Sequence, residues 1–493
     1  MPATITVSQS PDRYNLVVAP NIWTLDSISS AEDGYILQVQ AYQELTSTYT
    51  TLATVQQPAN PAGVAHFDIS KILQSQLDIA FVEETQDAIK TAGETVAYRV
   101  RWGSTTDDII TFNGTSNIYY AFNGYLDWRE INWLNNTSFI PFPTAVACPS
   151  EGPIPPPFET NARYLTRRLD YLHNYPKSSI PLRSSTYHTL SFFNRIGNYD
   201  IGSDWGNNEQ PWAVRIKFYQ SDNTLIQTVI YVLSNGTGLG PRPAYNSVII
   251  PAYETDEWIG TIGAGPQNLK DAGYWPSSSS AIWNLVSQTW GNYAVIWNLA
   301  SSDALVDHYD VQILSVDMCY WGANGTPAND QAATLEPYLG DLMYTQTFHV
   351  DDPCSKFDDV TVSFVNQYGV KDYFTFDRRN TWSQSIRRNN YDQILGSWSD
   401  QDFTIDQHGR GRRTFSTEIQ TNMTLNSYWM DDAESKWLEE LFTSPHIQVY
   451  YEGVWHPAVI TSNSYQQKTN ARDGLFQHTL NIQFANTKRV QRG

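Results

Sequence analysis

The chain has 493 residues and a formal net charge of −20 at pH 7, with 14% aromatic and 17% charged residues. A chain of this length exceeds one ordinary hydrophobic core and predicts about three domains. So acidic a surface repels phosphate backbones and anionic lipid. We therefore expect no direct nucleic-acid specificity and no membrane partner.

The sequence carries no targeting signal that we recognise. The first residues lack a basic stretch followed by an apolar core, so we expect no secretory signal. No apolar run approaches the roughly 20 residues that span a bilayer. Three cysteines, Cys148, Cys319 and Cys354, show no CxxC spacing, which argues against a disulfide framework. A reducing cytosol favours free thiols, and a Cys319–Cys354 pair stays open as the alternative.

Short β-branched runs separated by Gly, Pro and Asn favour strands over helices. The sequence therefore predicts a mainly β protein, with tandem antiparallel β-sandwiches followed by an α+β domain in which one helix packs on an antiparallel sheet. The expected boundaries are 1–125 for a fibronectin- or immunoglobulin-like sandwich, 126–159 for a Pro-rich linker, 160–348 for a second sandwich with long loops, and 349–493 for the α+β domain.

The first sandwich is expected from strands of alternating polarity at 35–42 and 96–102. Between them, Asp68 or Ser70 is expected to cap a short helix. Its apolar residues are Ile72, Leu73 and Leu77.

The run 148–157 contains five prolines, and such a run favours polyproline II and acts as a semi-rigid spacer. The same alternating pattern returns after it, so a second sandwich is expected. Its predicted strands cover 189–193, 212–219, 226–233 and 309–314.

The last segment predicts a hairpin and then the strongest helix of the chain. Strands at 360–365 and 371–376 flank a turn at 366–369. The helix covers 431–442, with Asp431 and Glu434 close to a capping box and Ser444-Pro445 ending it.

One face of this helix is apolar and is expected to form core, while Lys436 and Glu440 are expected to point away. The core residues are Trp437, Leu438, Leu441 and Phe442. Strands at 447–451, at 457–461 and at 478–484 follow, which predicts a helix packed on an antiparallel sheet.

No motif predicts catalysis or a cofactor. The nine histidines show neither HExxH nor HxH spacing, so the spacing gives a zinc site no support. Nucleophile-elbow, P-loop and dinucleotide motifs are also missing. Adjacent acidic pairs such as Asp107-Asp108 point to opposite strand faces and do not make an acid–base couple. We therefore expect no enzyme activity.

An acidic loop at 200–209 contains glycine and carboxamides beside Asp200, Asp204 and Glu209. Oxygen ligands on a flexible loop suit Ca²⁺, but the spacing is not that of an EF-hand. A solvated loop is the preferred interpretation, and a Ca²⁺ site is the alternative.

Two further features suggest contact surfaces. Aromatic segments at 127–133, 272–275 and 283–297 are expected in cores and interfaces, with stacking on sugar rings as the alternative. A basic stretch is expected to be an exposed strand face or a subunit contact, with a groove for a polyanion as the alternative. The predicted interface residues are Arg378, Arg379, Arg387, Arg388, Arg410, Arg412, Arg413, Lys488, Arg489 and Arg492.

The run Phe364-Val-Asn-Gln-Tyr-Gly-Val-Lys-Asp-Tyr-Phe-Thr-Phe376 resembles a recurrent F-x-N-x-x-G-x-x-D-x-x-x-F segment. Together with Trp437-Leu-Glu-Glu-Leu-Phe-Thr-Ser-Pro445, Pro457-Ala-Val-Ile460, Phe484-Ala-Asn486 and the opening around 58–74, it is similar to tail or baseplate structural proteins of tailed phages that infect Bacteroidota.

The resemblance implies a virion structural protein of the tail, baseplate or connector, assembled in the host cytoplasm. It implies a fibronectin-like opening, a tail-tube- or hub-like domain at 349–493 and ring assembly with copies of itself and other tail proteins. The alternative is a receptor- or glycan-binding tail module, an adhesin with or without hydrolase activity, whose partner is a host-surface glycan. The matched motifs are structural, so no catalytic residue is carried over.

Overall fold

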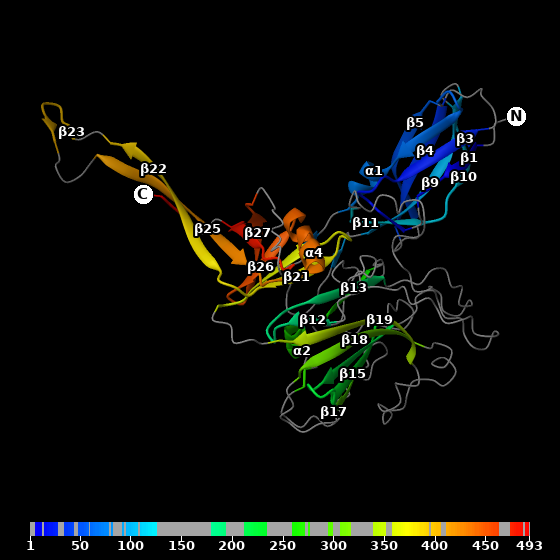
Figure 1. Ribbon diagram of the computed structural model, residues 1–493. Coiled ribbons are helices and arrows are strands. Elements are labelled where there is room, and N and C mark those ends of the chain that lie inside the picture. The colour runs from blue at the N-terminus through cyan, green and yellow to red at the C-terminus, as the bar shows by residue number, and fades with distance from the viewer. Residues whose placement is uncertain are drawn as a thin grey trace. The chain divides into compact units, whose positions relative to one another are not determined.

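A computed structural model is mainly β, which confirms the predicted fold class (Figure 1). By their contacts, residues 1–352 with 366–372 form a first compact unit, and 353–365 with 373–493 form a second. The residues described are 5–11, 14–27, 34–43, 48–58, 60–77, 80–81, 91–92, 95–106, 109–125, 179–193, 212–233, 259–271, 275–276, 294–298, 306–316, 339–351, 357–393, 396–405, 411–462, 474–486 and 489–492.

The first unit begins with two packed sheets. One sheet is antiparallel and has the order β1 (Ile5–Gln9), β3 (Ile22–Ser27), β6 (Val64–Asp68). The other has the order β2 (Tyr14–Leu16), β11 (Tyr119–Phe122), β9 (Thr95–Thr106), β4 (Gly34–Gln43), β5 (Thr48–Gln57), with β10 (Ile109–Thr115) also on β9. A separate two-stranded pair is β7 (Ala80–Phe81) with β8 (Thr91–Ala92).

One core joins these two sheets, because alternate residues of each strand face the same interior. Trp23 and Phe67 come from the three-stranded sheet, while Leu37, Tyr98 and Val100 come from the larger one. Two sheets that share a core in this way form a β-sandwich.

The short helix of this sandwich differs from its prediction at the cap. Helix α1 (Ser70–Gln74) begins after Ile69, which makes no side-chain cap hydrogen bond. The Asp68 carboxylate instead accepts hydrogen bonds from the backbone N–H groups of Ser70 at 3.0 Å and Asn21 at 3.2 Å. Asp68 therefore ties the helix start to a neighbouring segment, and neither predicted residue is the cap.

The first unit continues with a six-stranded sheet of the order β12 (Ser179–Leu182), β19 (Leu339–Val350), β18 (His308–Val316), β14 (Trp212–Tyr219), β15 (Leu225–Leu233), β17 (Ala294–Asn298). A pair, β13 (Thr189–Phe193) with β16 (Ile259–Gly263), and helix α2 (Pro266–Asp271) accompany it. The buried Tyr309 hydroxyl of β18 donates to the Ala264 carbonyl at 2.7 Å, which links the sheet to the end of β16.

The second unit is built on an eight-stranded sheet. Its order is β21 (Lys371–Phe376), β20 (Val360–Val365), β26 (Ile447–Tyr451), β27 (Val454–Ile460), β28 (Thr479–Phe484), β25 (Arg412–Asn426), β22 (Thr381–Asp392), and β29 (Arg489–Arg492) also pairs with β25. A short pair, β23 (Ser397–Trp398) with β24 (Phe403–Thr404), lies in the segment between β22 and β25.

Helix α4 (Asp432–Thr443) packs on this sheet, and its predicted cap is confirmed: the Asp431 carboxylate accepts from the Glu434 N–H at 2.8 Å. Trp437 is 1% exposed, and Leu438 and Leu441 are also buried.

The expectation that Glu440 points to solvent is wrong, because its side chain is only 2% exposed. Glu440 lies three residues after Trp437, so it borders the apolar stripe and does not oppose it. Phe442 is partly buried at the margin of the same core.

The turn between β20 and β21 shows why the predicted hairpin has an asparagine at 366 and a glycine at 369. The Asn366 side-chain oxygen accepts from the backbone N–H groups of Tyr368 at 2.9 Å and Val370 at 3.2 Å. Gly369 has φ +82°, and a Cβ there would lie 1.8 Å from the Asn123 carbonyl oxygen. Glycine is therefore required both by the backbone conformation and by the close approach.

Among the residues that the structure describes, no helix combines the length and apolar character needed to cross a membrane.

Candidate functional site

The most exposed feature of the second unit is a ribbon formed by β22 and by residues 412–420 of β25, where β29 adds a third strand along Ser416–Ile419. All twelve residues of β22 are exposed, and they pair antiparallel with β25 from Thr381 opposite Thr424 to Asp392 opposite Arg412. Figure 1 shows this pair in yellow and orange, extending beyond the rest of its sheet. The ribbon offers side chains on both of its faces.

Trp382 anchors the base of the ribbon. Its ring stacks on Phe484 with centroids 5.3 Å apart and lies 4.5 Å from the ring of Tyr451. Trp382 still has 41% of its surface exposed, so it is both an anchor and an accessible aromatic face.

Opposite partners share a face of the ribbon, and neighbours along a strand alternate between the two faces. Ile386 opposes Ile419 on one face, and Arg387 opposes Glu418 on the other. The register shifts between Asn389 and Asn390, and beyond it the rings of Tyr391 and Phe415 meet edge to face at 6.5 Å. The ribbon therefore combines exposed apolar side chains with charged ones.

The structure places six of the predicted interface arginines on or beside the ribbon. Arg378 and Arg379 precede β22, and the Arg378 Nε lies 3.7 Å from Asp377. Arg387, Arg388, Arg412 and Arg413 lie within the ribbon, and all six are exposed. In the register, Arg489 and Arg492 of β29 oppose Ile419 and Ser416. Arg410 and Lys488 lie outside the described residues.

Other predicted residues also fall outside the described part of the chain: the Ca²⁺ candidates Asp200, Asp204 and Glu209, the three cysteines and the aromatic segment 127–133. Trp275, from a second aromatic segment, meets Phe218 edge to face at 5.5 Å. The ring of Trp275 therefore packs against the buried ring of Phe218.

A serine–histidine pair lies within the core of the second unit. The Ser435 hydroxyl is 2.8 Å from the His478 Nε2, and the side chains are 0% and 3% exposed. Burial lowers the pKa of His478 from its ordinary value. Both groups are enclosed, so a substrate has no access to the hydroxyl and the contact is one of packing.

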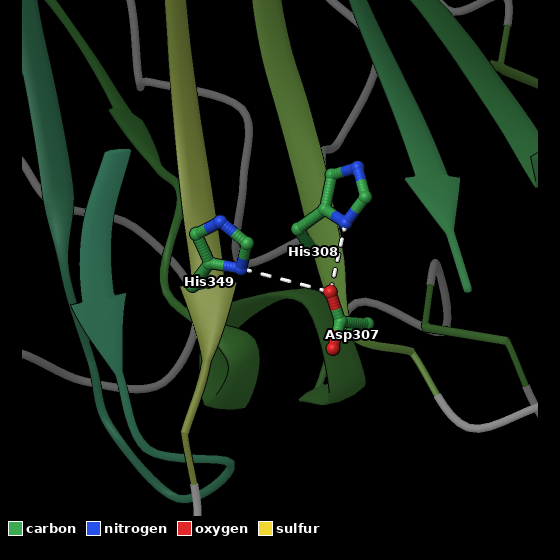
Figure 2. Close-up of side chains that lie close together, drawn as sticks. All are labelled: Asp307, His308 and His349. Atoms are coloured by element: carbon green, nitrogen blue, oxygen red, sulfur yellow. Dashed lines mark hydrogen bonds and ion pairs between the residues drawn. The ribbon is translucent and has the colours of Figure 1, made fainter. Parts of the chain in front are cut away.

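A second polar cluster lies on the six-stranded sheet and was missed by sequence reasoning. The Asp307 Oδ2 is 3.0 Å from the Nδ1 of His308 and 3.7 Å from the Nδ1 of His349, as Figure 2 shows. No local motif predicts it, because the two histidines are far apart in the chain and become neighbours only through the pairing of β18 with β19.

No protein-family model matches the sequence, and no curated protein matches it either.

Proposed function

We propose that the chain is a virion structural protein, a building block of a phage tail, baseplate or connector that assembles with copies of itself as part of a ring. The observation that carries this proposal is the exposed ribbon of β22 and β25. No residue of β22 is buried in a core, so the projecting ribbon is suited to contact with another subunit.

The chemistry of the ribbon favours a second copy of the chain as its partner. Residues 378–393 and 411–420 contain six arginines and two acidic residues, an excess of four positive charges, in a chain whose formal net charge is −20. Arginine and exposed aromatic side chains are enriched in protein interfaces, and arginine gives bidentate hydrogen bonds to carboxylates. The acidic surface of a neighbouring copy is complementary to such a ribbon.

A ring is consistent with this kind of contact. A basic ribbon that lies on an acidic surface elsewhere on the next copy makes a heterologous contact. Heterologous contacts repeated by rotation form closed rings when the rotation closes. Other tail proteins with acidic surfaces are further partners under this proposal.

Exposed aromatic residues support the alternative, a glycan-binding tail module. Trp429 is 51% exposed, and Tyr391 and Phe415 of the ribbon are 42% and 55% exposed. Flat aromatic faces stack on sugar rings. Trp437 does not contribute to such a surface, because it is 1% exposed.

The native mass of the purified full chain, which gives its oligomeric state, tests the proposal. Substitutions of two exposed isoleucines serve as a matched pair, one in the ribbon and one outside it. Ile386→Asp changes the ribbon, where the residue is 45% exposed, and Ile110→Asp changes β10, where it is 50% exposed. We expect a defined oligomer for the unchanged chain and for Ile110→Asp, and monomers for Ile386→Asp and Arg387→Glu. All three variants should keep the circular dichroism spectrum of the folded chain, since all three positions are exposed.

A monomeric unchanged chain at micromolar concentration, or an oligomer that Ile386→Asp leaves intact, would contradict assembly through the ribbon. A glycan array separates the alternative. Binding that is lost in Trp429→Ala, together with a monomeric chain, would favour the adhesin. Mass spectrometry of purified particles from a phage that encodes the chain should find it as a multi-copy component.

A further inference from the structure

We propose that Asp307, His308 and His349 bind a divalent transition metal ion, with Zn²⁺ as the representative. The cluster lies in the first unit, and the inference is independent of the proposed assembly through the ribbon. It rests on how the backbone holds the three side chains, on the distances between their ligand atoms and on their access to solvent.

The backbone fixes Asp307 from both sides. Its N–H donates to the Tyr219 carbonyl at 2.9 Å, and its own carbonyl accepts from the Val350 N–H at 2.8 Å. Neighbouring residues inside a strand point to opposite faces. Asp307 directly precedes β18, however, and its carboxylate turns toward the imidazole of His308 (Figure 2).

The two imidazoles come from adjacent strands. His308 and His349 are directly opposite each other in the register of β18 and β19, so their side chains share a face. Their ring centroids are 5.2 Å apart. Tyr219 stacks on His308 at 5.0 Å with an angle of 13° between the rings, which holds the plane of that imidazole. Ligands held in this way lose little freedom when an ion binds.

The distances fit an ion among the three groups. Two ligands of a tetrahedral zinc ion with bonds of about 2.0–2.1 Å lie about 3.3 Å apart. The Asp307 oxygen is 3.0 Å from one imidazole nitrogen and 3.7 Å from the other, and the ligand atoms all lie within 4.8 Å of one another. Small side-chain rotations bring them to ligand spacing.

Hydrogen bonding alone accounts for only part of this arrangement. The 3.0 Å contact of Asp307 with His308 is an ordinary hydrogen bond. The 3.7 Å separation from His349 is beyond hydrogen-bond range, although both ring nitrogens face the same oxygen. A shared cation explains why all three ligand atoms converge.

The types of the ligand atoms and the exposure of the side chains indicate which ion binds. Imidazole with one carboxylate suits zinc, cobalt and nickel, whereas Mg²⁺ and Ca²⁺ prefer oxygen ligands throughout. The side chains of Asp307 and His349 are 41% and 48% exposed, so an ion enters from solvent. Three protein ligands leave a fourth position for water. The bound ion would join β18 to β19 and stabilise this end of the sheet.

The test titrates the metal-free full chain with Zn²⁺ by calorimetry and with Co²⁺ by visible absorption, which reports coordination directly. We expect about one ion per chain at this site and a melting temperature raised by a few degrees with zinc. His349→Ala and Asp307→Asn should weaken binding by roughly tenfold or more. The control variant is His66→Ala, in which the substituted histidine is an exposed strand residue outside the cluster. This variant should bind zinc as the unchanged chain does.

Absence of zinc binding at micromolar concentration would overturn the proposal. Equal affinity in His349→Ala, Asp307→Asn and His66→Ala would overturn it as well, because the bound ion would then lie elsewhere. The His349 side chain is about half exposed, so its variant is expected to fold, and its melting temperature without metal checks this.

Discussion

His478 shows how one buried side chain makes the second unit sensitive to acid. Burial lowers its pKa from 6.5, and the Ser435 hydroxyl contacts its Nε2 at 2.8 Å. Above this ordinary value both the folded and the unfolded chain hold a neutral imidazole. As the pH falls below it, the unfolded chain takes up a proton that the folded chain resists. Stability is therefore complete above the unfolded pKa and is lost as the pH falls through the folded one.

We predict that His478→Gln flattens this dependence, because glutamine retains a hydrogen-bonding group but does not titrate. Thermal melts of the full chain between about pH 7 and about pH 5 measure it. Burial also lowers the pKa of His446, so a residual slope of the same sign is expected. An unchanged slope in the variant would show that His478 does not couple acid to unfolding.

Individual residues also show which features of the structure could be predicted from the sequence and which could not. The Asp431 cap could be predicted, because the Asp431 carboxylate and the Glu434 N–H that donates to it lie three residues apart in the chain. The proximity of the His308 and His349 imidazoles could not, because it depends on the register between two strands. The burial of Glu440 could not be predicted, because it depends on what covers the edge of the apolar stripe of helix α4.

At the scale of elements, helix α4 provides the sharpest contrast between two substitutions. Trp437→Ala removes a side chain that is 1% exposed and lies 5.6 Å from the ring of Phe364. We expect a loss of about 3–5 kcal/mol in the free energy of unfolding. Asp431→Ala removes one hydrogen bond at the cap, and we expect a loss of about 1 kcal/mol.

Thermal and urea melts of the two variants measure the difference. A Trp437→Ala melt equal to that of the unchanged chain would remove the core role assigned to this helix. A loss for Asp431→Ala as large as that for Trp437→Ala would mean that the cap, and not the packing, holds the helix.

The strands of the cores could be predicted because burial imposes a pattern on them. The strands at 360–365, 371–376 and 447–451 have the expected bounds, since apolar residues there face one interior. The ribbon was predicted only as a basic exposed strand face or subunit contact, without the bounds of its strands. No residue of β22 is buried, so its sequence carries no apolar face from which a long strand could be inferred.

For the whole molecule, the proposed assembly through the ribbon predicts a dependence on salt. The ribbon carries an excess of positive charge in a chain of formal net charge −20. Exposed ion pairs are screened as the Debye length falls from about 10 Å at 0.1 M to about 3 Å at 1 M salt. We expect the oligomer to dissociate progressively over this range in sedimentation experiments. An oligomer insensitive to salt would point to apolar contacts instead.

The division of the whole chain into units was only partly open to prediction. The contacts of the chain divide at 352, and the four predicted segments, with their boundary at 349, stay a prediction. The grouping of residues 366–372 with the first unit did not follow from the sequence. It depends on tertiary contacts such as the Tyr125 N–H donating to the Gln367 carbonyl at 3.0 Å.

Strand β25 gives the second unit a mechanical property. It runs unbroken from the ribbon at Arg412 to Asn426, and its last residues pair with β28 from Asn422 opposite Gln483 to Asn426 opposite Thr479. A pull on the ribbon is therefore transmitted along the strand axis into those hydrogen bonds. Bonds perpendicular to the strand are then loaded in shear and resist together, whereas a hairpin pulled open at its end releases them one at a time. A subunit held by its ribbon would tolerate tension on the assembly without losing its sheet strand by strand.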